Sequence, residues 1–271
     1  MKKISVIFLI SLVLFSCEKV KTDSQLIIEN ANIPLISRVL IGSEIYTEYS
    51  YNSANLVTEE KGKFRYVTHT YDDINQLITS DFYWDTRIAS SNSHILEALL
   101  NREEWVNPEN TAKSISHELE YIINEHKIRK SYIRTENTNS DVVEYLYEGD
   151  RIIRATGYYN GSLSGYTVYL YDVNGNIIKE TRYNITSEGI AELSTTTEYE
   201  YDNMHNPYQS FKRLLTPGIY TNPNNITKET YTLNFDVGPS IDKVQITEYS
   251  YEYNDLGYPV KVNGGTEYVY K

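Results

Sequence analysis

The sequence predicts an all-β fold, a curved antiparallel meander of β-hairpins that forms an open or barrel-like sheet with one short helical insertion. A Tyr-x-Tyr phrase, followed by turn-forming residues and an Ile/Val-rich exit, recurs along the chain. Tyrosine is unusually abundant, with 27 residues against 6 phenylalanines. It favours strands whose face is partly exposed to solvent, because its ring is apolar and its hydroxyl is polar. Side chains around these phrases alternate as an antiparallel sheet requires.

Each copy of the phrase predicts one hairpin. Residues two apart in a strand share a face, so both tyrosines of a pair point the same way. Asp172-Val173-Asn174-Gly175 then supplies turn formers, and Gly175 is free to take a positive φ. Ile177 and Ile178 open the returning strand. The clearest copies span residues 49–57, 145–153, 169–178 and 251–260.

Weaker copies extend this pattern over residues 69–78 and 199–207, and the chain ends on Tyr268-Val269-Tyr270. The spacing between copies is uneven, which predicts hairpins of unequal length and not a regular solenoid. Antiparallel hairpins are expected over 44–270. The predicted turns fall at 52–55, 72–75, 148–150, 172–175, 202–206 and 254–257.

Two segments between the copies need separate assignment. Residues 115–123 fit both a helical stripe and a strand alternation. Alignment with the copy at 169–178 favours a degenerate hairpin over 119–134, with a helix as the alternative. Residues 94–101 predict a short helix instead, because Ser93 can cap it and its apolar residues form one stripe.

The first residues predict export and a lipid anchor. Two lysines precede a mostly apolar run over residues 4–15, which is too short to span a bilayer. Leu14-Phe15-Ser16-Cys17 resembles a bacterial lipobox, which implies cleavage before Cys17 and lipidation of its sulfur; the alternative is an ordinary cleaved signal with a stray cysteine. The predicted domains are a lipoprotein signal peptide over 1–16, a lipid-anchored tether over 17–34, and a repeat β-domain over 35–271 with an insertion near 90–114.

The charge balance restricts the partners. The formal net charge is −12, and removal of the two lysines in the signal brings it to −14. An acidic chain is a poor partner for nucleic acid, which requires a basic patch. Cys17 is the single cysteine, so neither an intrachain disulfide nor a thiolate zinc site can form. The membrane is therefore expected to be reached through the lipid on Cys17.

The YxYDxxGNxI phrase at 169–178 resembles the YD repeats of RHS-type proteins. With the lipobox and the stretch 201–208 leading to Asn224-Asn225-Ile226, the chain is similar to YD-repeat (RHS-like) lipoproteins of the Bacteroidota cell envelope, many of which have no assigned function. The resemblance covers residues 44–271 and implies a curved, antiparallel, barrel-like sheet. It implies no activity, since the repeated residues are turn and strand formers.

Catalytic and metal-binding patterns are few. The five histidines include no HExxH pair. Residues 161–165 predict a hairpin loop, because Leu163 stands where a nucleophile elbow needs serine. Residues 172–176 lack the later Gly and Glu of a calcium loop. Acidic neighbours such as Glu59 and Glu60 are interpreted as solvated charges facing opposite ways. We therefore expect no enzyme, no cofactor and no metal.

Two functional hypotheses follow. The first is a non-catalytic lipoprotein of the cell envelope, anchored in the outer membrane, whose hairpin scaffold contacts another envelope protein. The second is binding of a glycan or another extracellular ligand through exposed tyrosines. Interdigitated rings would favour the scaffold, and coplanar exposed rings the ligand binder. The tyrosines assigned to packing or ligand contact are Tyr145, Tyr147, Tyr169, Tyr171, Tyr199 and Tyr201.

Overall fold

The computed structural model describes part of the chain, and that part belongs to the second of its two compact units, 1–32 and 33–271. Cys17, most of the predicted tether and the predicted helix at 94–101 lie outside the described residues. The described residues are 33–63, 65–84, 105–109, 111, 113–122, 125, 127–135, 138–211, 217, 220–234 and 243–271.

The described residues form a 17-stranded antiparallel sheet, which confirms the all-β prediction. One short 3-10 helix, η2 (Gln209–Phe211), lies between two of the strands. The strands are β1 (Ile36–Ile41), β2 (Glu44–Tyr51), β3 (Val57–Gly62), β4 (Arg65–Tyr71), β5 (Leu77–Trp84), β6 (Lys113–Tyr121), β7 (Ile128–Thr135), β8 (Thr138–Glu148), β9 (Arg151–Tyr159), β10 (Ser162–Tyr171), β11 (Ile177–Ile185), β12 (Ala191–Tyr201), β13 (Ile226–Leu233), β14 (Lys243–Glu248), β15 (Tyr251–Tyr253), β16 (Pro259–Val262) and β17 (Thr266–Tyr270).

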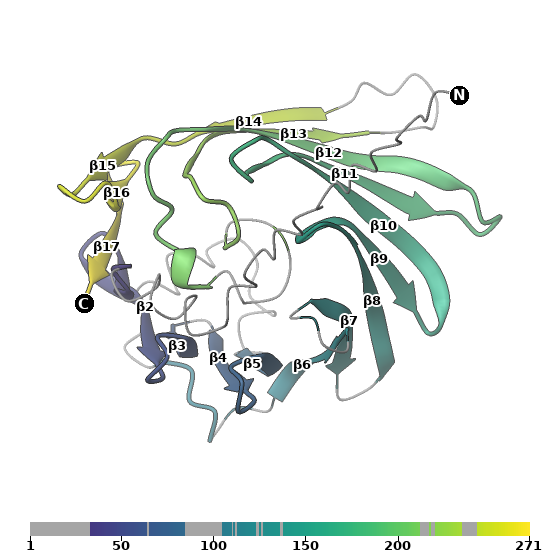
Figure 1. Cartoon of the computed structure of the whole chain (residues 1–271), viewed down its shortest axis with the longest axis horizontal. Helices are drawn as coiled ribbons and strands as arrows, with labels where there is room; N and C mark the ends of the chain where they lie inside the picture. The colour runs from purple at the N-terminus through teal and green to yellow at the C-terminus, as the bar shows by residue number, and fades with distance from the viewer. Residues whose placement is uncertain are drawn as a thin grey trace, which may run out of the picture. The chain divides into compact units, whose positions relative to one another are not determined.

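The sheet is a meander that curves round on itself (Figure 1). Strand pairs follow the order β14–β13–β12–β11–β10–β9–β8–β7–β6–β5–β4–β3–β2–β1–β17–β16–β15. The first and last strands in this order, β14 and β15, follow each other directly in the chain. The segment from β14 to β15 therefore pairs with β13 through its first half and with β16 through its second half.

The curvature has a repeated local cause. In each Tyr-x-Tyr hairpin the register shifts at the last tyrosine, as between Leu170 and Tyr171 of β10. Tyr171 then lies opposite Ile177, while Leu170 lies opposite Lys179, so the returning strand has one extra residue. Such a bulge bends its strand and increases the local twist. Repetition at the same place in successive hairpins bends the whole sheet in one direction.

The turns at 52–55, 72–75, 148–150, 172–175 and 254–257 are confirmed. In the best copy, the backbone N–H of Asp172 donates to the carbonyl of Asn176 at 2.9 Å. Gly175 has a φ of 97°, as predicted, and asparagine takes the same left-handed position as Asn55 (59°) and Asn75 (63°) in two other copies. Asparagine tolerates this conformation better than most residues with a side chain.

Other local predictions have mixed outcomes. The hairpin over 119–134 is confirmed as β6 and β7, so the helical alternative there is wrong. The predicted loop at 161–165 is wrong, since the turn consists of Asn160 and Gly161 and β10 begins at Ser162. Strand β1 lies before the predicted start of the repeats at 44. It carries no Tyr-x-Tyr phrase, and its pairing with both β2 and β17 fixes its place.

The predicted hairpin turn at 202–206 is also wrong, because the strand that pairs with β12 begins only at Ile226. The turn is split by an insertion, residues 203–224. The backbone N–H of Asp202 donates to the carbonyl of Asn225 at 3.1 Å, and Asn225 Nδ2 donates to Asp202 Oδ2 at 3.1 Å. These bonds match those between Asp172 and Asn176 in the intact turn.

This insertion supplies the largest fully buried side chain among the described residues, Phe211. Phe211, at the end of η2, is fully buried and forms a cluster with Val57 and Leu77. Its ring contacts Tyr49 from the sheet and Tyr208 from the insertion, at centroid distances of 4.9 and 5.4 Å. Figure 1 shows η2 inside the curve of the sheet. We call the sheet face that contacts Phe211 the concave face and the other the convex face.

Candidate functional site

The tyrosines form a repeated hydrogen-bonded row on the sheet. The hydroxyl of Tyr171, at the end of β10, donates to the backbone carbonyl of Ile152, the second residue of β9, at 2.8 Å. The same contact joins a tyrosine to the start of an earlier strand all along the sheet. We call these residues the tyrosine row: Tyr51, Tyr71, Tyr121, Tyr147, Tyr171, Tyr201, Tyr251 and Tyr270, which donate to Ile36, Val57, Leu77, Ile128, Ile152, Ile177, Ile226 and Pro259.

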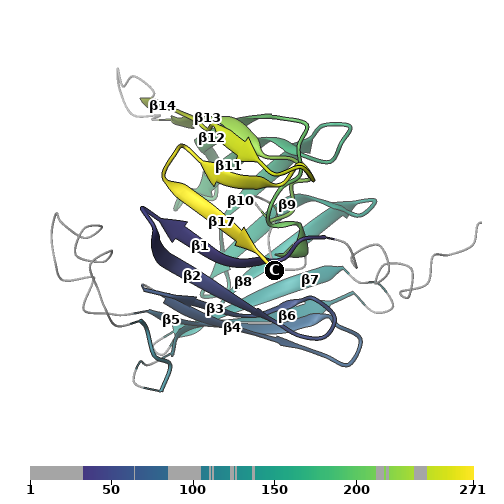
Figure 2. The same ribbon diagram turned by 90° about the vertical axis from the view of Figure 1, so that its left-hand side faces the viewer.

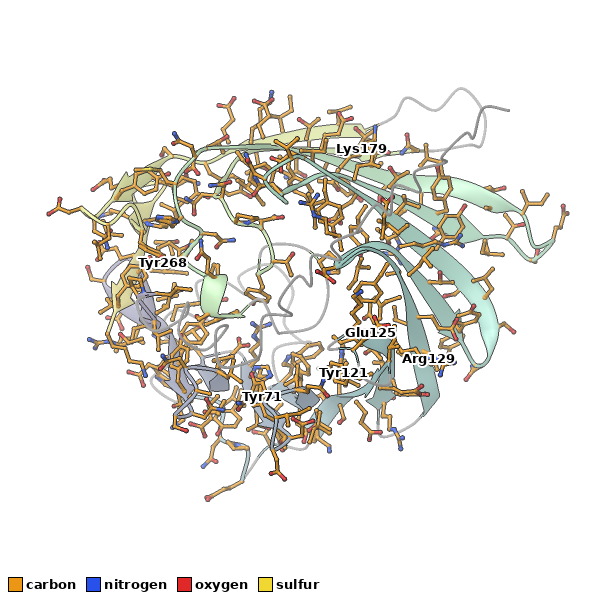
Figure 3. All side chains as sticks on the ribbon, in the orientation of Figure 1. Tyr71, Tyr121, Glu125, Arg129, Lys179 and Tyr268 are labelled. Carbon is orange, nitrogen blue, oxygen red and sulfur yellow. The ribbon has the colours of Figure 1, made fainter. Side chains whose placement is uncertain are left out.

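The first tyrosine of each pair packs on the same face. Tyr169 is buried with Ala155 and Ile177, and Tyr145, Tyr171 and Tyr199 pack against this cluster. Of the six predicted tyrosines, Tyr147 and Tyr201 complete the set through their hydroxyl bonds. In Figure 3, Tyr71 and Tyr121 lie on the concave side of the sheet and Arg129 on its outer side.

Burial keeps these phenols neutral. Desolvation raises the pKa of Tyr171 to about 12, against the opposing effect of the Arg151 charge. Desolvation also raises the pKa of Tyr145 to about 12. A phenol that stays protonated well above neutral pH remains a hydrogen-bond donor, which the contacts with backbone carbonyls require. Tyr171 and Tyr145 are therefore uncharged in the physiological range.

The convex face is polar and carries ion pairs between neighbouring strands. Lys130 and Glu144 lie directly opposite each other in β7 and β8 with an N–O distance of 2.7 Å. Lys179 and Glu198 of β11 and β12 are paired in the same way at 2.9 Å. Exposed pairs of this kind each contribute at most about 1 kcal/mol.

Some tyrosines occupy the convex face as well. Tyr166 of β10 lies between Arg154 of β9, whose guanidinium is 3.9 Å from its ring centroid, and Tyr183 of β11, which stacks on it at 4.8 Å. Both faces of the Tyr166 ring are thus occupied by side chains of this chain. A sugar-binding platform requires a free aromatic face, which Tyr166 does not offer.

A buried polar network on strands β3, β4 and β5 was not predicted. His69 Nδ1 lies 2.8 Å from Ser80 Oγ, and His69 Nε2 lies 3.1 Å from Glu60 Oε1. Arg65 Nη2 donates to Glu60 Oε2 at 2.9 Å. A carboxylate can only accept, so His69 Nε2 carries the proton that is donated to Glu60. The interpretation of Glu60 as solvated charge is therefore wrong.

Glu60 is 4% exposed because it lies on the concave side of β3, whereas its neighbour Glu59 bonds to Tyr66 on the other side. The two glutamates do face opposite ways, as predicted. The sequence carries no signal for the difference in burial, since it depends on the neighbouring strands and on the insertion. The sequence likewise does not indicate that His69 pairs with Ser80, because this contact depends on the register between β4 and β5.

The network has the composition of a Ser-His-Glu triad without the access that catalysis needs. Ser80 is 0% exposed, and His69 is also buried. A nucleophile must reach a substrate carbonyl, with hydrogen-bond donors placed around the developing oxyanion. With Ser80 closed off from solvent, the network satisfies the hydrogen bonds of a buried histidine and a buried carboxylate.

Glu60 makes the fold sensitive to acid. Burial alone raises its pKa, but the hydrogen bond from His69 and the charge of Arg65 outweigh this effect and hold the pKa below its ordinary value. A folded-state pKa below the unfolded value stabilises the protein above about pH 4.5, and this stabilisation is lost as the pH falls through the folded-state pKa.

We expect Glu60→Gln to lower the free energy of unfolding at neutral pH by about 1–3 kcal/mol, because the bonds from His69 and Arg65 lose their charged acceptor. The loss should shrink at an acidic pH below the folded-state pKa of Glu60, where the wild-type carboxylate is also protonated. Urea unfolding at both pH values measures the difference. Glu198→Gln, in an exposed pair, is the matched control and should show little effect at either pH. An equal loss at both pH values would contradict a charge effect.

The described residues contain no group of three or more His, Cys, Asp or Glu side chains placed to hold a metal ion. Within the same residues, no helix has the length and apolarity needed to cross a bilayer.

No protein-family model matches the sequence, and no curated protein matches it. Among solved structures, the chain is similar to a porin-like protein from Bacteroides vulgatus ATCC 8482, with 10% identity and a TM-score of 0.41 over 88% of this chain and 99% of that one. It is also similar to a TcdB2-TccC3 structure without its hypervariable C-terminal region, with 13% identity and a TM-score of 0.31 over 84% of this chain and 10% of that one. A DUF3836 family protein from Parabacteroides distasonis ATCC 8503 matches 39% of this chain and 91% of its own, with 16% identity and a TM-score of 0.25. Membership of a YD-repeat family stays a prediction.

Proposed function

We propose that the chain is a non-catalytic, lipid-anchored protein of the cell envelope, whose sheet is a scaffold for contact with another envelope protein. The observation that carries this proposal is the tyrosine row. Its hydroxyls bond to backbone carbonyls of other strands, and the paired rings pack on the concave face. Residues that are engaged within the sheet in this way stabilise its architecture.

The two main alternatives, an enzyme and a glycan binder, fit the described residues less well than a scaffold does. An enzyme needs an accessible nucleophile, base or acid, and the best-arranged set in the described residues has its serine fully buried. A glycan binder needs free ring faces. Arg151 lies over the Tyr171 ring at 5.5 Å, and Lys127 lies over the Tyr147 ring at 5.7 Å. Side chains of the protein itself thus lie over two of the rings that the glycan hypothesis would use.

The proposed location rests on the N-terminal sequence. Leu14-Phe15-Ser16-Cys17 follows a short apolar run, as in bacterial lipoproteins. The polar convex face and the net charge of −12 suit an aqueous compartment. A lipid with two or more acyl chains on Cys17 then supplies a stable membrane attachment, since a single chain would bind only marginally. We infer that the outer membrane carries this anchor.

We expect Cys17→Ser to release the protein from membranes. The wild-type chain should sediment with the membrane fraction and require detergent for extraction, because its acyl chains partition into lipid. Cell fractionation followed by immunoblotting measures the distribution. Ser24→Ala, a change in the same predicted tether, is the control and should leave the chain membrane-bound. If Cys17→Ser stays with the membrane, the anchor is something other than the lipid on Cys17.

A further inference from the structure

Strand β14 forms one end of the strand order. It pairs with β13 along its whole length, and no other described strand pairs with it. Figure 2 shows β14 at the margin of the sheet, beyond the yellow strands that carry the C-terminus. Val244 and Ile246 are 57% and 58% exposed, although they alternate in a strand as core residues would.

On this edge the backbone of β14 presents hydrogen-bonding groups that pair with no described strand. The N–H of Tyr249, just after β14, donates to the carbonyl of Thr227, the second residue of β13, at 2.8 Å. In an antiparallel pair, bonded and non-bonded residues alternate, and the register from β14 into β13 is unshifted. The N–H and C=O groups of Val244, Ile246 and Glu248 therefore point away from β13.

The neighbouring hairpin stops short of these groups. The backbone of Ser250 also points away from β13, and there it is bonded by Asn263, which accepts from the Ser250 N–H and donates to the Ser250 carbonyl at 2.9 Å in each case. Asn263 lies in the turn between β16 and β17, so this hairpin ends at that level. Beyond it, the edge of β14 continues for the length of an ordinary short strand.

The edge lacks the usual protection against pairing. Natural edge strands carry proline, a bulge or charges pointing inward. Residues 243–248 contain neither proline nor glycine, the pairing with β13 has no bulge, and the charges stand at the two ends, Lys243 and Glu248. An exposed strand with these properties is a template for strand addition, in which a partner supplies the missing hydrogen bonds.

The charge around the edge indicates the partner. The four strands β12 to β15 carry six glutamates and two lysines. Glu198 and Glu200 form ion pairs with Lys179 and Lys228. The remaining charges on these strands are Glu192, Glu229, Glu248 and Glu252 against Lys243. Glu229 lies opposite Thr247 on the concave side. Burial, and to a lesser extent the nearby Glu229 carboxylate, raises the pKa of Glu180 on the same side.

We propose that the free edge of β14 binds an extended, cationic segment of another protein, which adds to the sheet as a further strand. Small apolar or β-branched residues of the partner lie beside Val244 and Ile246 on the convex face. Its basic residues alternate with them and approach Glu229 on the other face. This proposal rests on the proposed scaffold role and names the surface and the chemistry of the partner. A second copy of this acidic chain would meet electrostatic repulsion instead.

The test uses the full chain as the lipid-free Cys17→Ser variant and a labelled peptide, Lys-Val-Lys-Ile-Lys-Val-Lys, with a Glu-for-Lys peptide as its charge control. Fluorescence anisotropy measures binding. Ile246→Pro removes an N–H that points outward and leaves the bonds to β13 intact, so the sheet should tolerate it. Val173→Pro is the matched control, because Val173 is exposed in the 172–175 turn, where proline is also tolerated.

We expect the cationic peptide to bind at least about tenfold more tightly than the anionic one, and Ile246→Pro to weaken binding at least about tenfold. Val173→Pro should bind like wild type. Added salt should weaken the interaction, since exposed charges are screened. Thermal melts of both proline variants establish that they fold; if Ile246→Pro does not fold, Ile246→Lys, which opposes a cationic strand at the same edge, takes its place.

Three results would overturn the proposal. Ile246→Pro or Ile246→Lys could bind the cationic peptide like wild type, or the two peptides could bind equally. Alternatively, sedimentation could show a dimer of the wild-type chain that Ile246→Pro dissociates, which would make a second copy the occupant. The scaffold role is tested separately, by the stability of the tyrosine variants. If the peptide binds but those variants are as stable as the wild type, the scaffold role is contradicted and the proposed strand addition at β14 still holds.

Discussion

Phe211→Ala should lower the free energy of unfolding by about 3–5 kcal/mol, the usual cost of truncating a fully buried aromatic ring. Phe211 is 0% exposed and lies between the sheet, through Val57 and Leu77, and the rest of the insertion, through Tyr208 and Tyr220. Its removal leaves a cavity between the sheet and the insertion, which the surrounding side chains cannot fill. Denaturant unfolding followed by tyrosine fluorescence measures the change.

Tyr159→Ala is the matched control for this substitution. Tyr159 is also aromatic but is 54% exposed at the end of β9, so its loss should cost less than about 0.5 kcal/mol. If Phe211→Ala and Tyr159→Ala unfold at the same denaturant concentration, the insertion does not contribute to the core. The 203–224 segment would then be an appendage to a sheet that is stable alone.

Tyr171→Ala should lower the free energy of unfolding by about 2–4 kcal/mol, less than Phe211 because the ring is only half-buried. The substitution removes ring packing against the Ala155, Tyr169 and Ile177 cluster, and it removes the bond to the Ile152 carbonyl. It also ends the contact with Arg151. Chemical unfolding of the purified lipid-free chain measures the loss.

The same variant separates the scaffold from the glycan hypothesis. If the tyrosine pairs were a binding platform, Tyr171→Ala would leave stability near wild type and abolish binding on a glycan array. The scaffold predicts the reverse, a clear loss of stability and no glycan binding by either protein. Tyr145→Ala and Tyr199→Ala should behave like Tyr171→Ala, since both rings pack against the same cluster.

Local chemistry made the hairpins predictable. The turn at 172–175 depends on Asp172, which accepts from the backbone N–H of Asn176 at 2.8 Å, and on the positive φ of Gly175. Both requirements are met within a few residues, so a sequence pattern can report them. The hairpin at 119–134 followed from alignment with this copy, although its turn has different residues.

The split turn, the buried polar network and the edge of β14 were not predictable, because they depend on pairing between segments that lie far apart in the sequence. Asp202 bonds to Asn225 with 22 residues between them, and no local signal distinguishes this split turn from an intact one. The partnership of Glu60, His69 and Ser80 depends on the register of three strands. The free edge of β14 follows from where a neighbouring hairpin ends. Each of these features is a consequence of pairing between distant segments.

The tyrosine row lies between these cases. The repeat predicted that both tyrosines of a pair share a face, which explains their packing. It did not predict that the later hydroxyl donates to a backbone carbonyl of another strand, as from Tyr201 to Ile177. That contact requires the strand offset produced by each bulge. Repetition of one phrase in the sequence therefore reflects repetition of one hydrogen bond in the fold.

The most direct test of this account is the unfolding free energy of Tyr171→Phe, which removes the hydroxyl and keeps the ring. We expect a loss of about 1–2 kcal/mol, because the hydrogen bond to the Ile152 carbonyl disappears. Tyr158→Phe removes a hydroxyl that bonds to Glu144 at 3.3 Å on the convex face, and it should lose less than about 0.5 kcal/mol. Equal stability of Tyr171→Phe, Tyr158→Phe and the wild type would contradict the claim that the tyrosine row holds the hairpins together.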